Sequence, residues 1–114
     1  MTDDELRERV MHRLSTIAKK NPGYVQRTET EALNELRKRD GNPLFGGSAA
    51  YTIPGFIGHV ITRYPDQMKF MRMPAKELKA LMKIAPVGTD VWLQCRAAQM
   101  YWRLCWLDSQ KERR

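Results

Sequence analysis

Apolar residues recur every three or four positions through much of this chain, the spacing that places them on one face of an α-helix. The first apolar face consists of Leu6, Val10, Leu14 and Ile17. Thr2 and Glu5 have the spacing of a capping box, and a proline-glycine pair at 22–23 prevents continuation. These features predict a helix over residues 3–20.

Two more helices are predicted in the middle of the chain, on either side of its longest loop. A second capping-box pair precedes residues 29–39 and predicts a short helix there. The glycine-rich stretch 41–50 predicts a loop, in which Leu44 and Phe45 can anchor to the core. A helix is predicted over about 52–64, and its two glycines make it dependent on packing against other elements.

Residues 66–85 carry two parallel rows of side chains at helical spacing. The apolar row is Met68, Met71, Ala75, Leu78, Met82 and Ala85. The basic row, here called the basic stripe, is Lys69, Arg72, Lys76, Lys79 and Lys83. Pro74 lies in the middle of this stretch and allows two interpretations. The stretch is either one kinked helix, or a short turn over 66–72 followed by a helix with Pro74 in its first turn. The second is favoured, because the residue before a proline resists helical dihedral angles.

The last predicted helix, over 90–110, contains all three tryptophans and is apolar around most of its circumference. Its only polar strip is Arg96, Gln99 and Arg103, and such a helix is typical of the centre of a fold. Residues 111–114 are expected to fray. The chain is therefore predicted to be a single all-α domain over 1–114, a bundle of about five helices around a tryptophan-rich C-terminal helix.

Composition supports this interpretation, and the cytoplasm is the location expected by default. A chain of 114 residues can bury one modest core, and no apolar run is long enough to cross a membrane. The acidic N-terminus, without an apolar stretch behind it, argues against a signal peptide. Cys95 and Cys105 are separated by about 15 Å along one predicted helix, so they are expected to be reduced, buried thiols.

The sequence contains no recognisable catalytic or metal-binding motif. Gly46-Gly47-Ser48 lacks the lysine of a phosphate-binding loop, and His12 is expected to be an exposed histidine beside helical carboxylates. His59 lies on an otherwise apolar helix and has no evident partner. We therefore expect no enzymatic activity, no cofactor, no metal and no small-molecule substrate.

The formal net charge of +7 makes nucleic acid the first partner to consider. Residues 66–114 contribute ten basic and five acidic side chains, so most of the excess lies there. A cation at every turn can follow a phosphate backbone, although lysine-rich helix faces often serve only solubility. Only Glu77 interrupts the basic stripe, which raises the case for phosphate contact. Further candidate contacts are Arg37, Lys38 and Arg39.

The tryptophan-rich helix allows two interpretations, as buried core or as an interface. Residues 74–105 can be drawn as a helix-turn-helix, but the second helix is too apolar at its start to read bases well. Tryptophan and arginine are enriched at interface centres, so the helix could dock a partner or a second copy. The candidate interface residues are Trp92, Arg96, Gln99, Trp102, Arg103, Trp106, Leu44 and Phe45.

Two functional hypotheses follow from the sequence. The first is a small, non-enzymatic regulatory protein that contacts the phosphate backbone of DNA or RNA through its basic helix face. The alternative is an inhibitor or adaptor that docks on a larger enzyme with an acidic surface, using the same cations and an apolar Trp/Phe patch without touching nucleic acid. Neither hypothesis involves a membrane, and both allow a homodimer through the 90–110 helix.

Overall fold

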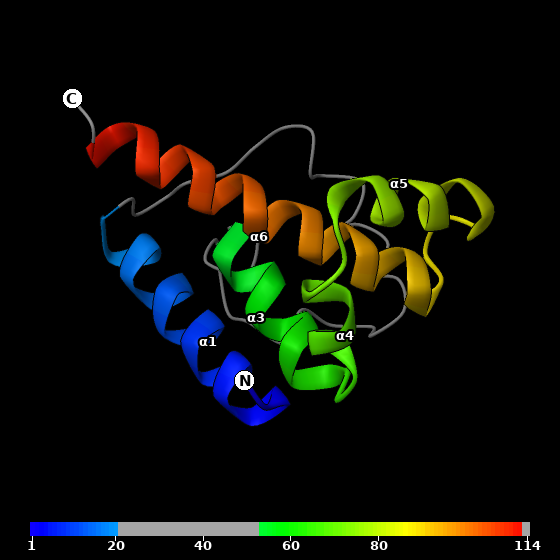
Figure 1. Ribbon diagram of the computed structural model, residues 1–114, viewed down its shortest axis with the longest axis horizontal. Coiled ribbons are helices and arrows are strands. Elements are labelled where there is room, and N and C mark those ends of the chain that lie inside the picture. The colour runs from blue at the N-terminus through cyan, green and yellow to red at the C-terminus, as the bar shows by residue number, and fades with distance from the viewer. Residues whose placement is uncertain (21–52, 113–114) are drawn as a thin grey trace.

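The computed structural model describes residues 1–20 and 53–112, which form an all-α fold (Figure 1). The helices in this part of the chain are α1 (Asp3–Lys20), α3 (Ile53–Arg63), α4 (Gln67–Met71), α5 (Ala75–Ile84) and α6 (Asp90–Glu112). The predicted all-α class is therefore confirmed, with no strand in the described ranges. The predicted helix over 29–39 and loop over 41–50 lie outside the described residues.

Helix α1 begins and ends where local sequence signals place its limits. The Thr2 hydroxyl accepts a hydrogen bond from the Glu5 backbone N–H at 3.2 Å, and the Glu5 carboxylate accepts one from the Thr2 N–H at 3.4 Å. These two bonds are the predicted capping box. The helix packs against α3 through Val10, Leu14 and Ile17, all of which are buried.

Helix α3 packs against both α1 and α6, which explains how a segment with two glycines remains helical. Its large apolar side chains, Phe56, Ile57, Val60 and Ile61, are buried. Burial of four such side chains contributes far more than the roughly 1 kcal/mol lost at each glycine. The expectation that this helix depends on tertiary packing is consistent with that arrangement.

The stretch 66–85 forms two separate elements, as the favoured interpretation of its proline expected, although the first is a short α-helix instead of a turn. Helix α4 ends at Arg72, which is its C-cap, and Pro74 is the extended N-cap of α5 with φ −67° and ψ 154°. Pro74 thus precedes the first turn of α5 instead of lying within it. Its carbonyl accepts the first hydrogen bonds of α5, from the N–H groups of Glu77 and Leu78 at 3.0 and 3.1 Å.

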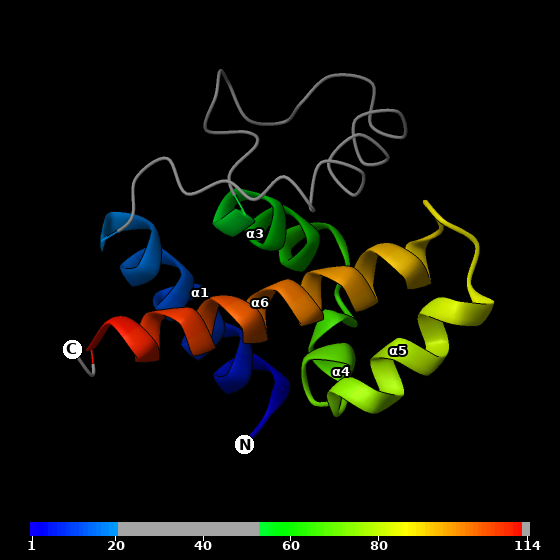
Figure 2. The ribbon, with the colours of Figure 1, turned by 90° about the horizontal axis from the view of Figure 1, so that it is seen from above.

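Helix α6 is central, because α1, α3, α4 and α5 all pack against it. Figure 2 shows it crossing the molecule, with α5 beside its N-terminal half and α1 near its C-terminal half. The other helices do not enclose α6 on every side, however. Trp102 is 48% exposed and Trp106 is 59% exposed, because no described helix covers that side of α6. Trp92, Met100 and Leu104 are core residues, as the buried interpretation expected.

Two buried glutamines join α4 to α6. The Gln67 side-chain amide donates a hydrogen bond to the Gln94 backbone carbonyl at 3.0 Å. The Gln94 side-chain amide in turn donates to the Asp66 carboxylate at 2.8 Å. These bonds fix the N-terminal end of α4 against the first turns of α6.

The remaining sequence-based expectations for the core also hold. Cys95 and Cys105 lie on α6 as buried, free thiols, as their separation along one helix predicted. Among the described helices, none is long and apolar enough to span a membrane.

Candidate functional site

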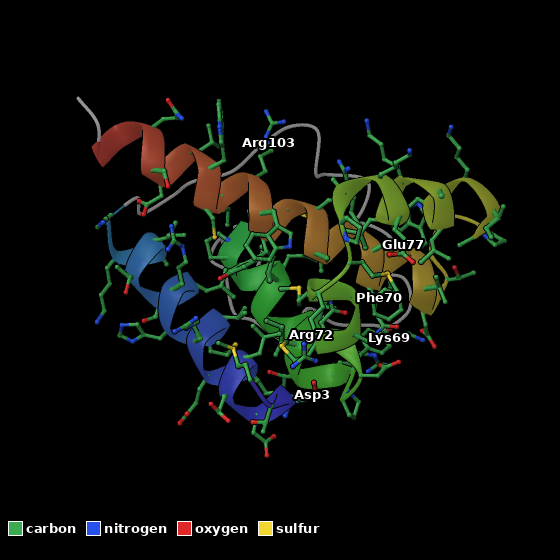
Figure 3. The ribbon with its side chains drawn as sticks, in the orientation of Figure 1. Asp3, Lys69, Phe70, Arg72, Glu77 and Arg103 are labelled. Carbon is green, nitrogen blue, oxygen red and sulfur yellow. The ribbon has the colours of Figure 1, made fainter. Side chains whose placement is uncertain are left out.

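The five cations of the basic stripe do not lie on one face, because the chain changes direction at Pro74. Arg72 forms an ion pair with Asp3, and its guanidinium also donates a hydrogen bond to the Met1 carbonyl at 3.0 Å. Figure 3 shows the side chains of Arg72 and Asp3 together at the start of α1. This cation connects α4 to α1, so part of its charge is neutralised within the molecule.

Lys69 lies in a shallow groove that also contains the single carboxylate of the stripe region, Glu77. The groove is lined in addition by Phe70, whose ring centre lies 6.0 Å from the Lys69 Nζ. Figure 3 shows Lys69, Phe70 and Glu77 on the same part of the molecule. Glu77 lines the same groove as Lys69 and faces a different side of α5 from Lys79, which lines another groove.

Lys76, Lys79 and Lys83 are exposed on α5 and follow each other at spacings of three and four residues. Such spacing places them on one face of the helix, opposite the side that buries Leu78. Within the described ranges none of the three forms an ion pair. The part of the basic stripe that remains available to a ligand is this three-lysine face.

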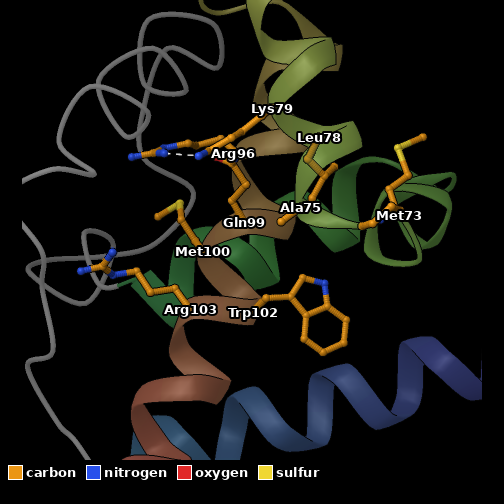
Figure 4. A pocket seen from close by; sticks show the side chains of 10 residues that line it. Met73, Ala75, Leu78, Lys79, Arg96, Gln99, Met100, Trp102 and Arg103 are labelled. Atoms are coloured by element: carbon orange, nitrogen blue, oxygen red, sulfur yellow. Dashed lines mark hydrogen bonds between the residues drawn. The ribbon is translucent and has the colours of Figure 1, made fainter.

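A groove of about 690 Å³ lies between α5 and α6, next to the lysine face (Figure 4). It is called the α5–α6 groove below. Its lining residues are Met73, Pro74, Ala75, Leu78, Lys79, Arg96, Gln99, Met100, Trp102 and Arg103. The groove thus brings one lysine of the basic stripe together with four of the candidate interface residues of α6.

The lining of the α5–α6 groove suits an anionic ligand with an apolar part. Lys79, Arg96 and Arg103 supply three positive charges, and none of the described lining residues is a carboxylate. The Arg96 guanidinium donates a hydrogen bond to the Gln99 side-chain carbonyl at 3.2 Å, which restricts both side chains. Methionine, alanine and leucine side chains form the apolar remainder of the lining.

Trp102 is held in place on one edge and left accessible elsewhere. Its indole Nε1–H donates a hydrogen bond to the Met71 carbonyl at 3.2 Å. The neighbouring Tyr101 ring contacts it edge-on, with centroids 5.0 Å apart and planes inclined by 68°. Since 48% of the residue remains exposed, the indole offers apolar surface to a ligand in a fixed orientation.

Other predicted site residues lie elsewhere. Trp92 is 6% exposed and belongs to the core, so it offers no docking surface on this chain. Trp106 is exposed on α6 but does not line the α5–α6 groove. The candidates Arg37, Lys38, Arg39, Leu44 and Phe45 lie outside the described residues.

Sequence patterns did not identify the apolar lining from Met73, Pro74, Ala75, Leu78 and Met100. One available signal was the short connection between the last two helices, residues 85–89. Helices joined by so few residues are usually antiparallel neighbours. That rule would have brought the start of α5 close to the middle of α6, where Lys79 meets Arg96 and Arg103.

The two thiols of the core are shifted by their surroundings toward the protonated form. Desolvation by burial raises the pKa of the Cys95 thiol. Burial also raises the pKa of the Cys105 thiol, more than hydrogen bonds with Tyr101 and Arg13 lower it. Both thiols are therefore protonated at neutral pH and are weak nucleophiles. Across residues 1–20 and 53–112, no three His, Cys, Asp or Glu side chains come together as a metal site.

The chain matches no known protein family, no curated protein sequence and no solved structure. The case for a function therefore depends on the α5–α6 groove and the lysine face beside it.

Proposed function

We propose that this protein is a small, non-enzymatic regulator that binds nucleic acid through the outer surface of α5 and α6. The observation that supports this most is the grouping of cations from two helices. Lys79, Arg96 and Arg103 line one groove in which the described part of the chain places no carboxylate, and Lys76 and Lys83 extend the positive surface along α5. A phosphate backbone is the common biological polyanion that such a surface suits.

The proposal differs from the simplest form of the sequence-based hypothesis. In that form, five cations on a single helix face would lie along the phosphate backbone, and each would contact one phosphate. Here Arg72 is paired with Asp3, and Lys69 shares its groove with Glu77, so α5 supplies three contacts. The arginines of α6 supply the others, from the opposite side of the α5–α6 groove.

Salt dependence of binding tests this proposal. Each phosphate contact contributes about −0.9 to the slope of log affinity against log salt on duplex DNA and about −0.7 on single strands. Replacing Lys76, Lys79 and Lys83 by glutamine keeps helix propensity nearly constant and removes three charges. We expect a folded variant that binds more weakly, with a slope shallower by about 2–3. The loss should be similar across sequences, because lysines on phosphates do not read bases.

A matched control removes the same charge elsewhere. Arg9, Lys19 and Lys69 are exposed on α1 and α4, away from the α5–α6 groove. Their triple replacement by glutamine should change the slope by much less than the α5 triple variant. Equal effects of the two variants would mean that net charge alone governs binding. Absence of any affinity for DNA or RNA at about 50 mM salt would refute the proposal.

Exposure of the tryptophans on α6 favours a second candidate function. Trp106 is 59% exposed outside the groove, and large exposed aromatics are common at protein interfaces. An adaptor or inhibitor would use Trp106 and the lysine face to dock on an acidic protein. In that case a stoichiometric protein partner survives nuclease treatment of the lysate and is lost with Trp106→Ala.

A further inference from the structure

We infer that the α5–α6 groove takes a single-stranded segment of nucleic acid, with one unpaired base stacked on the Trp102 indole. This inference rests on the proposed function and names the form of nucleic acid that the groove selects. The groove combines an aromatic surface at Trp102 with cations at Lys79, Arg96 and Arg103.

The aromatic part is Trp102. Stacking requires a ring that is accessible on a face and does not rotate away. The hydrogen bond from its Nε1 to the Met71 carbonyl and the edge contact with Tyr101 restrict the indole, while 48% of the residue stays exposed. Figure 4 looks onto the flat face of this ring. Every base has a π-face, so such a surface accepts bases with little sequence preference.

The cationic part, Arg96 and Arg103, lines the same groove as the indole. Trp102 and Arg103 are adjacent in sequence, so their side chains leave α6 about 100° apart, and Figure 4 shows them on either side of the helix. Arg96 extends to the same side as Arg103. A nucleotide in the α5–α6 groove can therefore place its base against Trp102 while its phosphate faces arginine. This division of apolar and cationic surface is typical of proteins that bind single strands.

The geometry favours an unpaired strand over a duplex. Inside a duplex each base is covered on both faces by its neighbours, so an indole can stack only after unstacking a step at a cost of a few kcal/mol. The site is a groove, which a flexible strand can enter. A strand is also favoured over a free nucleotide, because Lys76 and Lys83 continue the positive surface beyond the groove lining.

The test compares variants of Trp102 by fluorescence anisotropy with a labelled single-stranded oligonucleotide of about 12 nucleotides and with its duplex. We expect the wild type to bind the single strand more tightly than the duplex. Trp102→Ala should weaken single-strand binding by about 5- to 150-fold, the range for loss of one stacked base, and weaken duplex binding much less. Trp102→Phe retains a stacking ring and should keep most of the affinity.

Trp106→Ala is the matched control, since Trp106 is exposed one turn further along α6 and does not line the groove. It should bind the single strand like the wild type. Far-ultraviolet circular dichroism confirms that each variant is folded. The stacking inference is overturned if Trp102→Phe binds as weakly as Trp102→Ala, or if Trp106→Ala loses as much affinity. Equal or tighter binding of a mononucleotide than of the strand overturns the assignment of a strand.

Failure of this inference can be separated from failure of the proposed function. Suppose that duplex and single strand bind equally, both lose affinity in the Lys76, Lys79 and Lys83 triple variant, and Trp102→Ala changes nothing. The proposed function then stands, and the groove does not select single strands. If neither probe binds at about 50 mM salt, both the proposed function and the single-strand inference are refuted.

Discussion

The three tryptophans of α6 provide a graded test of how burial determines stability on one helix. Trp92 is 6% exposed, Trp102 48% and Trp106 59%. A fully buried tryptophan replaced by alanine costs about 3–5 kcal/mol, through lost transfer free energy and the cavity left behind. We therefore expect Trp92→Ala to lower the free energy of unfolding by about 4 kcal/mol.

Trp102→Ala and Trp106→Ala should lower the free energy of unfolding by less, because each of these side chains is already in contact with water in the folded protein. Half of the Trp102 surface is buried, and its hydrogen bond to the Met71 carbonyl adds a further contribution, so we expect about 2–3 kcal/mol. Trp106 has less buried surface, and its replacement should cost about 1 kcal/mol. The expected order is Trp92, then Trp102, then Trp106.

Urea unfolding followed by far-ultraviolet circular dichroism measures these differences without depending on the fluorophore that each variant removes. With an m-value of about 2 kcal/mol per molar urea, the three substitutions lower the midpoint by about 2, 1 and 0.5 M. The m-value should stay constant if each variant unfolds in one cooperative step. A Trp102→Ala variant as unstable as Trp92→Ala would show that Trp102 belongs to the core, and the groove surface would lose its main aromatic element.

Two further predictions concern the support of the groove and the buried thiols. Leu78 is the only residue of α5 that is buried, so Leu78→Ala should lower the free energy of unfolding by about 2–5 kcal/mol. Amide hydrogen exchange should become faster in α5 more than in α1, and an equal change in both helices would contradict this prediction. Burial raises the pKa of Cys95 and Cys105 above the ordinary value of 9.0, so the unfolded chain loses these protons first and stability should fall as pH rises above about 9. Urea midpoints at about pH 8 and about pH 10 measure this loss of stability, which should be smaller in the Cys95→Ala, Cys105→Ala double variant. An equal loss in the double variant would mean that other groups cause it.

The first and last residues of helices could be predicted from the sequence because they depend on residues nearby in the chain. The pairing of Thr2 with Glu5 fixes the start of α1, and Pro74 separates α4 from α5 through its missing N–H and its effect on the preceding residue. These effects act over three or four positions. Periodicity alone also identified the buried side of α1.

Local sequence patterns could not predict which side chains of α6 are exposed or which group each cation contacts. The helix is apolar around most of its circumference, so only the positions of the other helices decide that Trp102 is half exposed. Arg72 is paired because α1 begins beside α4, although Asp3 is 69 residues away in sequence. The meeting of Lys79 with Arg103 likewise depends on how α5 packs against α6.

The hydrogen bonds between α4 and α6 favour one register of the two helices over others. Apolar helices can slide along each other by one turn and exchange one set of contacts for a similar set. Here a slide would separate Gln67 from Gln94 at one end of α4 and the Met71 carbonyl from Trp102 at the other. Each buried polar group left without a partner costs about 1–3 kcal/mol. These hydrogen bonds can thus hold a five-residue helix in a single register and give the Trp102 indole one defined orientation.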